Sequence, residues 1–119
     1  MELVKLYDSE WKLMEILWEK EPVSARELTV LAAERIGWNK NTTYTIVKKL
    51  VKKGVVRREE PGFYCTSLVK KEEVQRSETR SLIDRLFRGS RKAFFAALLE
   101  DEEISEEELA QLKDMIEKR

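Results

Sequence analysis

Histidine is absent from this chain of 119 residues, and cysteine occurs only once. These absences exclude an internal disulfide, a zinc site built from Cys and His, and a catalytic triad that contains His. The carboxylates that remain as acid or base groups fall on predicted solvated faces and helix caps, and no Gly-rich phosphate loop is present. We therefore expect no metal, no cofactor and no enzymatic activity.

Long apolar runs are missing as well. No stretch approaches the roughly 20 residues needed to cross a bilayer, and charges at Glu2, Lys5 and Asp8 interrupt the segment where a signal peptide would lie. We expect a cytoplasmic protein with no membrane insertion. Glycine and proline number only four and two, which argues against a loop-rich or disordered chain.

The net charge is zero, with 23 basic and 23 acidic residues, but the two signs are segregated. Residues 36–58 contain seven bases and no acid, whereas residues 100–108 contain seven acids and no base. Because a polyanion responds to the local field, residues 36–58 are a candidate surface for nucleic acid. The acids are explained by the preference of helix N-termini for negative charge and by a soluble linker.

Apolar residues spaced by three and four predict a first helix with Asp8 and Ser9 as candidate N-caps, which ends at Glu21-Pro22. Ser24, followed three residues later by an acid, predicts the start of a second helix that runs over residues 25–36. Only three residues then separate it from the next predicted helix, as the tight turn of a helix-turn-helix requires.

Asn39 predicts the N-cap of a third helix over residues 40–53, and residues 55–58 and 63–68 predict a hairpin of two short strands. The polar face of the third helix carries side chains suited to base edges in the major groove, namely Lys40, Asn41, Thr42, Tyr44, Thr45 and Lys48. Further bases are suited to DNA phosphates, namely Lys49, Lys52, Lys53, Arg57 and Arg58.

Beyond Val69 the sequence predicts a charged helix that ends at Gly89, a short helix capped by Ser90, and a last helix capped by Ser105. Three helices followed by a hairpin are the element order of a winged helix-turn-helix domain. We thus expect a mostly α, α+β fold, with a winged-helix DNA-binding domain over residues 1–68 and a helical region over residues 69–119.

The chain resembles the penicillinase-repressor (BlaI/MecI) family of bacterial winged-helix transcriptional regulators. The resemblance rests on Ser9 to Trp18, Trp38 to Val47, Lys52-Lys53-Gly54, the Tyr64 to Leu68 strand and the acidic stretch from Glu102 to Leu109. It implies a homodimer that represses a promoter by occupying a palindromic operator of double-stranded DNA. It also implies that the helices after Leu68 form the dimerisation arm.

The apolar residues of that arm exceed what three short helices can bury alone, so they are the predicted dimer interface, although they could instead fold back on the first domain. They are Leu82, Ile83, Leu86, Phe87, Phe94, Phe95, Leu98, Leu99, Leu109, Leu112 and Met115. In relatives that answer β-lactams, the resemblance implies a membrane-linked sensor protease that cuts the arm between Asn and Phe. The corresponding bond here is Ala97-Leu98, where neither residue matches.

Relatives that answer copper carry a C-terminal cluster of Cys, whereas Cys65 lies on a predicted strand, so copper sensing is disfavoured. The function favoured by the sequence is a dimeric, sequence-specific transcriptional repressor. The alternative is a winged-helix adaptor that binds an acidic protein and no DNA.

Overall fold

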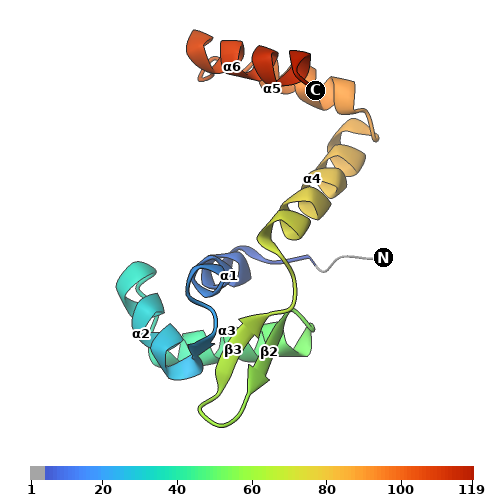
Figure 1. Ribbon diagram of the computed structural model, residues 1–119. Helices are drawn as coiled ribbons and strands as arrows, with labels where there is room; N and C mark the ends of the chain where they lie inside the picture. The colour runs from blue at the N-terminus through green and yellow to red at the C-terminus, as the bar shows by residue number, and fades with distance from the viewer. Residues whose placement is uncertain (1–4) are drawn as a thin grey trace. The chain divides into compact units, whose positions relative to one another are not determined.

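The computed structural model describes residues 5–119 and divides the chain into two compact units, Met1–Glu78 and Thr79–Arg119. Figure 1 shows the elements in chain order, which are α1 (Asp8–Lys20), β1 (Val23–Ser24), α2 (Ala25–Arg35), α3 (Lys40–Lys52), β2 (Val56–Glu59), β3 (Tyr64–Ser67), α4 (Lys71–Phe87), α5 (Arg91–Leu99) and α6 (Glu106–Glu117). The division falls inside α4, later than the boundary expected after residue 68, because Val74 packs in the core of the first unit.

Four predicted helix caps are confirmed. The side chains of Ser24, Asn39, Ser90 and Ser105 each accept a hydrogen bond from the amide three residues later, at 3.1, 2.8, 3.0 and 3.0 Å. Each bond satisfies an amide that has no partner within its helix. These caps fix where α2, α3, α5 and α6 begin.

The predicted cap of the first helix is wrong. Asp8 and Ser9 lie inside α1, and the N-cap is Tyr7. The Tyr7 amide donates to Glu10 Oε1 at 2.8 Å, so a side chain from the first turn satisfies the amide of the cap residue. The helix therefore begins without a conventional capping side chain.

The predicted two-stranded hairpin is part of a three-stranded antiparallel sheet of order β1-β3-β2. In the added pairing, Val23 lies opposite Cys65 and Ser24 opposite Tyr64. Strands β2 and β3 form the expected hairpin, in which Val56 pairs with Ser67 and Glu59 with Tyr64. The additional strand, β1, directly precedes α2 and pairs with β3, so it connects the hairpin to the start of that helix.

The core of the first unit gathers the apolar faces of α1, α2 and α3 with the sheet. Leu13, Leu17, Leu28 and Leu50 are each 1% exposed. At about 25 cal/mol per Å² of apolar surface, this burial is the main stabilising term that holds α3 in place. The second unit differs, since α5 and α6 contain no buried residue. None of the helices in residues 5–119 is long and apolar enough to cross a membrane.

Candidate nucleic-acid interface

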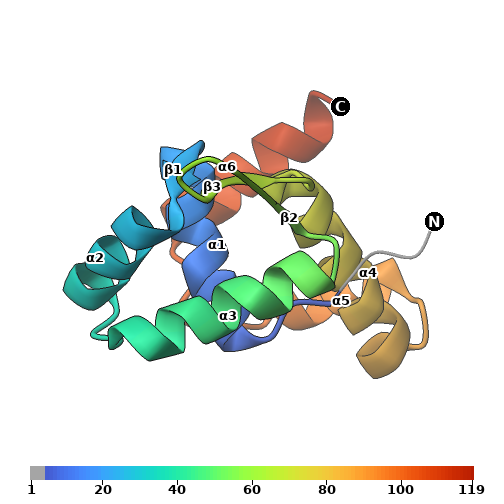
Figure 2. The same cartoon turned by 90° about the horizontal axis from the view of Figure 1, so that it is seen from below.

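The exposed face of α3 presents a row of polar and basic side chains. Lys40, Asn41, Thr42, Thr45, Lys48, Lys49 and Lys52 are all exposed, whereas Thr43, Ile46, Val47 and Leu50 on the other side are buried. Figure 2 looks onto α3, which lies along the near side of the first unit with α1 beyond it. The structure therefore brings all the predicted base readers onto one helix, with Tyr44 half-buried among them.

The N-terminus of α3 is suited to an anion. Its first turn contains no acid, and the Asn39 side chain satisfies only the Thr42 amide. The remaining amides of the first turn and the helix dipole attract negative charge. Lys40 adds a full positive charge beside them, with its Nζ 5.9 Å from the centre of the Tyr44 ring.

The turn before α3 sets its crossing with α2. The Ala32 carbonyl accepts from the amides of Ile36 and Gly37, at 2.9 and 3.0 Å. Gly37 has φ +83, a conformation that a side chain would strain. Trp38 is half-buried against the core. These contacts hold the polar face of α3 in a fixed orientation.

Lys53, a predicted phosphate contact, forms an ion pair and a hydrogen bond within the first unit. Its Nζ lies 2.6 Å from Glu10 Oε1, donates to the Lys5 carbonyl at 3.2 Å, and sits 4.5 Å from the centre of the Tyr7 ring. Glu10 is 1% exposed. Removing a cation from a buried carboxylate is costly, so Lys53 is not available to a DNA phosphate in this arrangement, in contrast to the prediction.

The hairpin presents a mixed surface. Both of its predicted phosphate contacts are exposed, but Arg57 pairs with Glu59 at 2.9 Å and the Arg58 guanidinium lies 5.2 Å from the centre of the Phe63 ring. The Phe63 carbonyl accepts from the Ala25 amide at 3.0 Å, which attaches the tip to α2. Phe63 and Tyr64 are half exposed.

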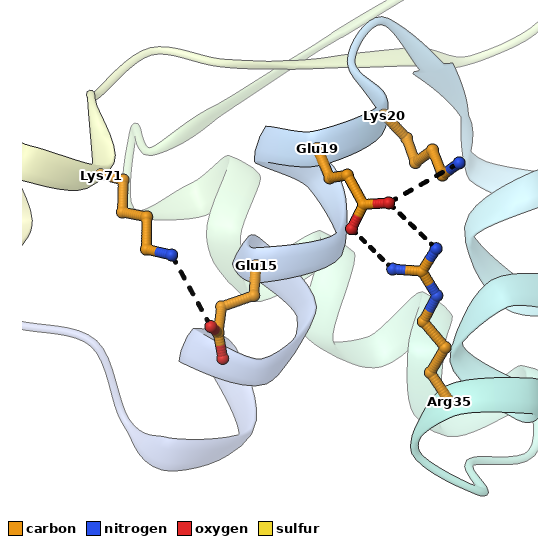
Figure 3. A network of polar contacts seen from close by, with 5 residues as sticks. All are labelled: Glu15, Glu19, Lys20, Arg35 and Lys71. Atoms are coloured by element: carbon orange, nitrogen blue, oxygen red, sulfur yellow. Dashed lines mark hydrogen bonds and ion pairs between the residues drawn. The ribbon is translucent and has the colours of Figure 1, made fainter.

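Figure 3 shows a polar network between α1, α2 and the first residue of α4. Arg35 donates to both carboxylate oxygens of Glu19, at 2.8 and 3.2 Å, and Lys71 lies 3.8 Å from Glu15. The hydrogen bonds and charge of Arg35 hold the pKa of Glu19 below its ordinary value. The four residues of these pairs line an open cleft together with Trp18 and Leu68, and none of them belongs to α3.

The eleven apolar residues predicted for the dimer interface divide into exposed, partly exposed and buried side chains. Leu86, Phe95, Leu98, Leu99 and Met115 are between 37% and 68% exposed, and Leu82, Phe87, Phe94, Leu109 and Leu112 are partly exposed. Ile83 is only 5% exposed and is thus already buried within its own chain, so we withdraw it from the interface. Ile116, which the predicted set omits, is 59% exposed beside Met115, and its position on the apolar stripe of the last helix was the available signal.

Two further predicted positions have clear surroundings. Ala97 and Leu98, at the candidate proteolytic bond, are exposed in the second half of α5. Cys65 is fully buried on β3, and burial raises the pKa of its thiol. Within residues 5–119 no three His, Cys, Asp or Glu side chains come together as a possible metal site.

Comparison with known proteins identifies the family of this chain. The sequence profile of the penicillinase repressor family matches residues 6–118. The chain belongs to the penicillinase repressor family. A 16.5 kDa protein from the ptsI 3' region of Latilactobacillus sakei is 31% identical over 110 residues, which cover 91% of this chain and 75% of that protein. The penicillinase repressor of Staphylococcus aureus is 25% identical, over 95% of this chain and 91% of that protein.

The fold of this family member agrees with a solved structure. The DNA-binding domain of the repressor BlaI superposes with a TM-score of 0.55 at 21% identity, covering 61% of this chain and 93% of that domain. The winged-helix fold predicted from the sequence is thereby confirmed. Family membership and fold together make the chain a DNA-binding transcriptional repressor of the penicillinase repressor family.

Proposed function

We propose that this repressor acts as a homodimer that occupies a palindromic operator, with one α3 in the major groove of each half-site. The observation that carries the proposal is the exposed face of α3, which combines short polar side chains with lysines and contains no acid. Short polar side chains can approach base edges, and the lysines can neutralise the flanking phosphates.

We assign base contacts to Asn41, Thr42, Tyr44, Thr45, Lys40 and Lys48. Asn41 can pair with the two major-groove groups of adenine, and the threonines offer a methyl group to thymine. We assign phosphate contacts to Lys49, Lys52, Arg57 and Arg58. Because Arg57 is paired with Glu59, its phosphate contact requires that ion pair to open, so the hairpin contributes less than α3.

The dimer is proposed on the predicted apolar residues of α4, α5 and α6, with the exception of Ile83. A single recognition helix buries too little surface for specific binding, whereas two related by a two-fold axis read half-sites about 34–36 Å apart. In relatives with sensor-controlled repression, cleavage of this region would release the operator. The Ala97-Leu98 bond is the candidate position here, and a membrane-linked protease its candidate partner.

A selected-site binding assay followed by a salt titration tests the proposal. If the dimer neutralises about 6–8 phosphates, affinity for the selected operator should fall by roughly 10³-fold between about 50 and 200 mM salt. A nearly flat response, or binding to no oligonucleotide, would contradict DNA binding and favour the adaptor.

Variants of α3 separate the two kinds of contact. Asn41→Ala and Thr45→Ala should each cost about 1–3 kcal/mol on the selected operator and little on random DNA, because they remove base contacts. Lys52→Ala should weaken both duplexes alike, because it removes a phosphate contact. Equal losses on both duplexes for all three variants would contradict this division.

A further inference from the structure

The charges at the two ends of α5 oppose its helix dipole. Arg91 and Lys92 occupy the first turn, at the partly positive end, and Glu100 and Asp101 follow the last residue, at the partly negative end. The first turn contains no acid and the last turn no base. In an isolated helix this arrangement is unfavourable. By contrast, α6 has three acids in its first turn, as the dipole prefers.

Within residues 5–119, no ion pair offsets that cost for any of these four charges. All four side chains are exposed, and the ion pairs among residues 5–119 include none of them. Asp101 Oδ1 accepts the Glu103 amide at 2.9 Å, a neutral donor, so this bond brings no positive charge to the carboxylate.

The middle of α5 is apolar and open. Phe95, Leu98 and Leu99 are 37%, 37% and 48% exposed, and no residue of the helix is buried. The helix thus has a basic start, an exposed apolar middle and an acidic end. A surface of this kind is complementary to a copy of itself that runs in the opposite direction.

We propose that α5 pairs antiparallel with α5 of a second copy of this chain, across the two-fold axis of the dimer. Arg91 and Lys92 of each copy then lie beside Glu100 and Asp101 of the other, with the apolar residues between them. The helix has nine residues and a length of about 14 Å, so both charge clusters and the apolar centre belong to one helix contact. The inference rests on the proposed dimer and adds the direction in which its helices pair.

The charges select that direction. In a parallel pair, bases would lie beside bases and acids beside acids, which is repulsive at both ends. In the antiparallel pair each copy supplies what the other lacks, as the self-complementary interface of a two-fold dimer requires. The unfavourable orientation of the charges in one helix is relieved by the charges of the second.

Charge reversal in the full-length protein tests the pairing. One variant carries Arg91→Glu with Lys92→Glu, a second carries Glu100→Lys with Asp101→Lys, and a third carries all four substitutions. Self-association is measured by sedimentation equilibrium at low salt. We expect the first two variants to dimerise about tenfold more weakly, or worse, because like charges meet at both ends. The third should dimerise as the natural chain does, and an equimolar mixture of the first two should form heterodimers.

The helix dipole provides an opposite expectation, which keeps the test decisive. Suppose instead that the charges act only within their own helix. The first variant then places acids at the start of the helix and the second places bases at its end, so each should raise the free energy of unfolding. Dimerisation as tight as or tighter than that of the natural chain, or no heterodimer in the mixture, would overturn the pairing. Lys12→Glu with Arg26→Glu in the first unit is the matched control, since it makes the same charge change at exposed positions.

The outcome for the pairing is distinct from that for the proposed function. A natural chain that dimerises and binds its operator, while the reversed variants do so equally well, refutes only the antiparallel pairing. A natural chain that stays monomeric at micromolar concentration contradicts the dimeric repressor itself.

Discussion

Glu10 is a buried acid whose environment makes it dependent on one lysine. Its Oε1 accepts from the Tyr7 amide and pairs with Lys53 at 2.6 Å, while Oε2 is buried with no hydrogen-bond partner among the described residues. Lys53→Met should lower the free energy of unfolding by about 1–3 kcal/mol, because it leaves a buried carboxylate without its cation. Urea denaturation of the full chain measures the change.

The double variant identifies the cause. Glu10→Gln keeps an acceptor for the Tyr7 amide and removes the charge, so Lys53→Met should cost less in that background. Lys52→Met, at the exposed neighbouring position, is the control and should change stability little. Additive losses in the double variant would show that the ion pair contributes nothing.

Glu19 gives the pH prediction at this scale. Arg35 lowers its pKa below the ordinary value of 4.5, so the pair stabilises the folded state above about pH 4.5 and this contribution is lost as the pH falls through the lowered pKa. Both side chains are exposed, so the effect on stability is small. A carboxylate NMR titration should show the pKa of Glu19 rising toward 4.5 in Arg35→Gln. The pKa of Glu19 should stay unchanged in Lys71→Gln, because this substitution removes only the ion pair of Lys71 with Glu15.

At the scale of the element, α3 depends on its N-cap. Asn39 Oδ1 accepts the Thr42 amide at 2.8 Å, and no other side chain caps the helix within the described structure. Asn39→Ala should lower the free energy of unfolding by about 0.5–2 kcal/mol, as measured by urea denaturation. Asn39→Ser should retain most of the stability because serine caps well. A loss as large with serine as with alanine would contradict the capping role.

The sequence predicted the helices better than the sheet, for a physical reason. A helix is specified by spacing and caps within a short segment, and four of the caps are where the sequence predicts them. The strand β1 has two residues, and its partners on β3 lie about forty positions later in the chain, so no local pattern identifies it. Short strands of this kind are specified only by tertiary pairing.

In the candidate site, too, local features could be predicted from the sequence and a contact between distant residues could not. The polar face of α3 follows directly from helical periodicity, so its members were predictable together. The engagement of Lys53 was not, because it requires a buried acid on another helix. A signal did exist, since Glu10 shares the stripe of the buried residues Leu13, Met14 and Leu17 at helical spacing. A charge on an apolar stripe predicts a partner without naming it.

At the scale of the whole molecule, operator binding should depend on the geometry of two half-sites. Insertion of about 5 base pairs between them turns the second half-site to the opposite side of the duplex, since one turn takes 10–10.5 base pairs. Affinity should then fall to that of a duplex with one half-site scrambled, as measured by a gel-shift titration. Unchanged affinity would show that the chain binds each half-site independently.

The short strand β1 bears on how the DNA adapts to the protein. It joins the hairpin to the beginning of α2, and the Ala25–Phe63 backbone bond reinforces that attachment. Because α2 in turn packs against α3, the hairpin and α3 would meet the duplex as one rigid surface in the proposed complex. A binding sequence whose grooves do not match must bend or twist to fit, so the flexibility of base steps that no side chain touches will help to rank operators.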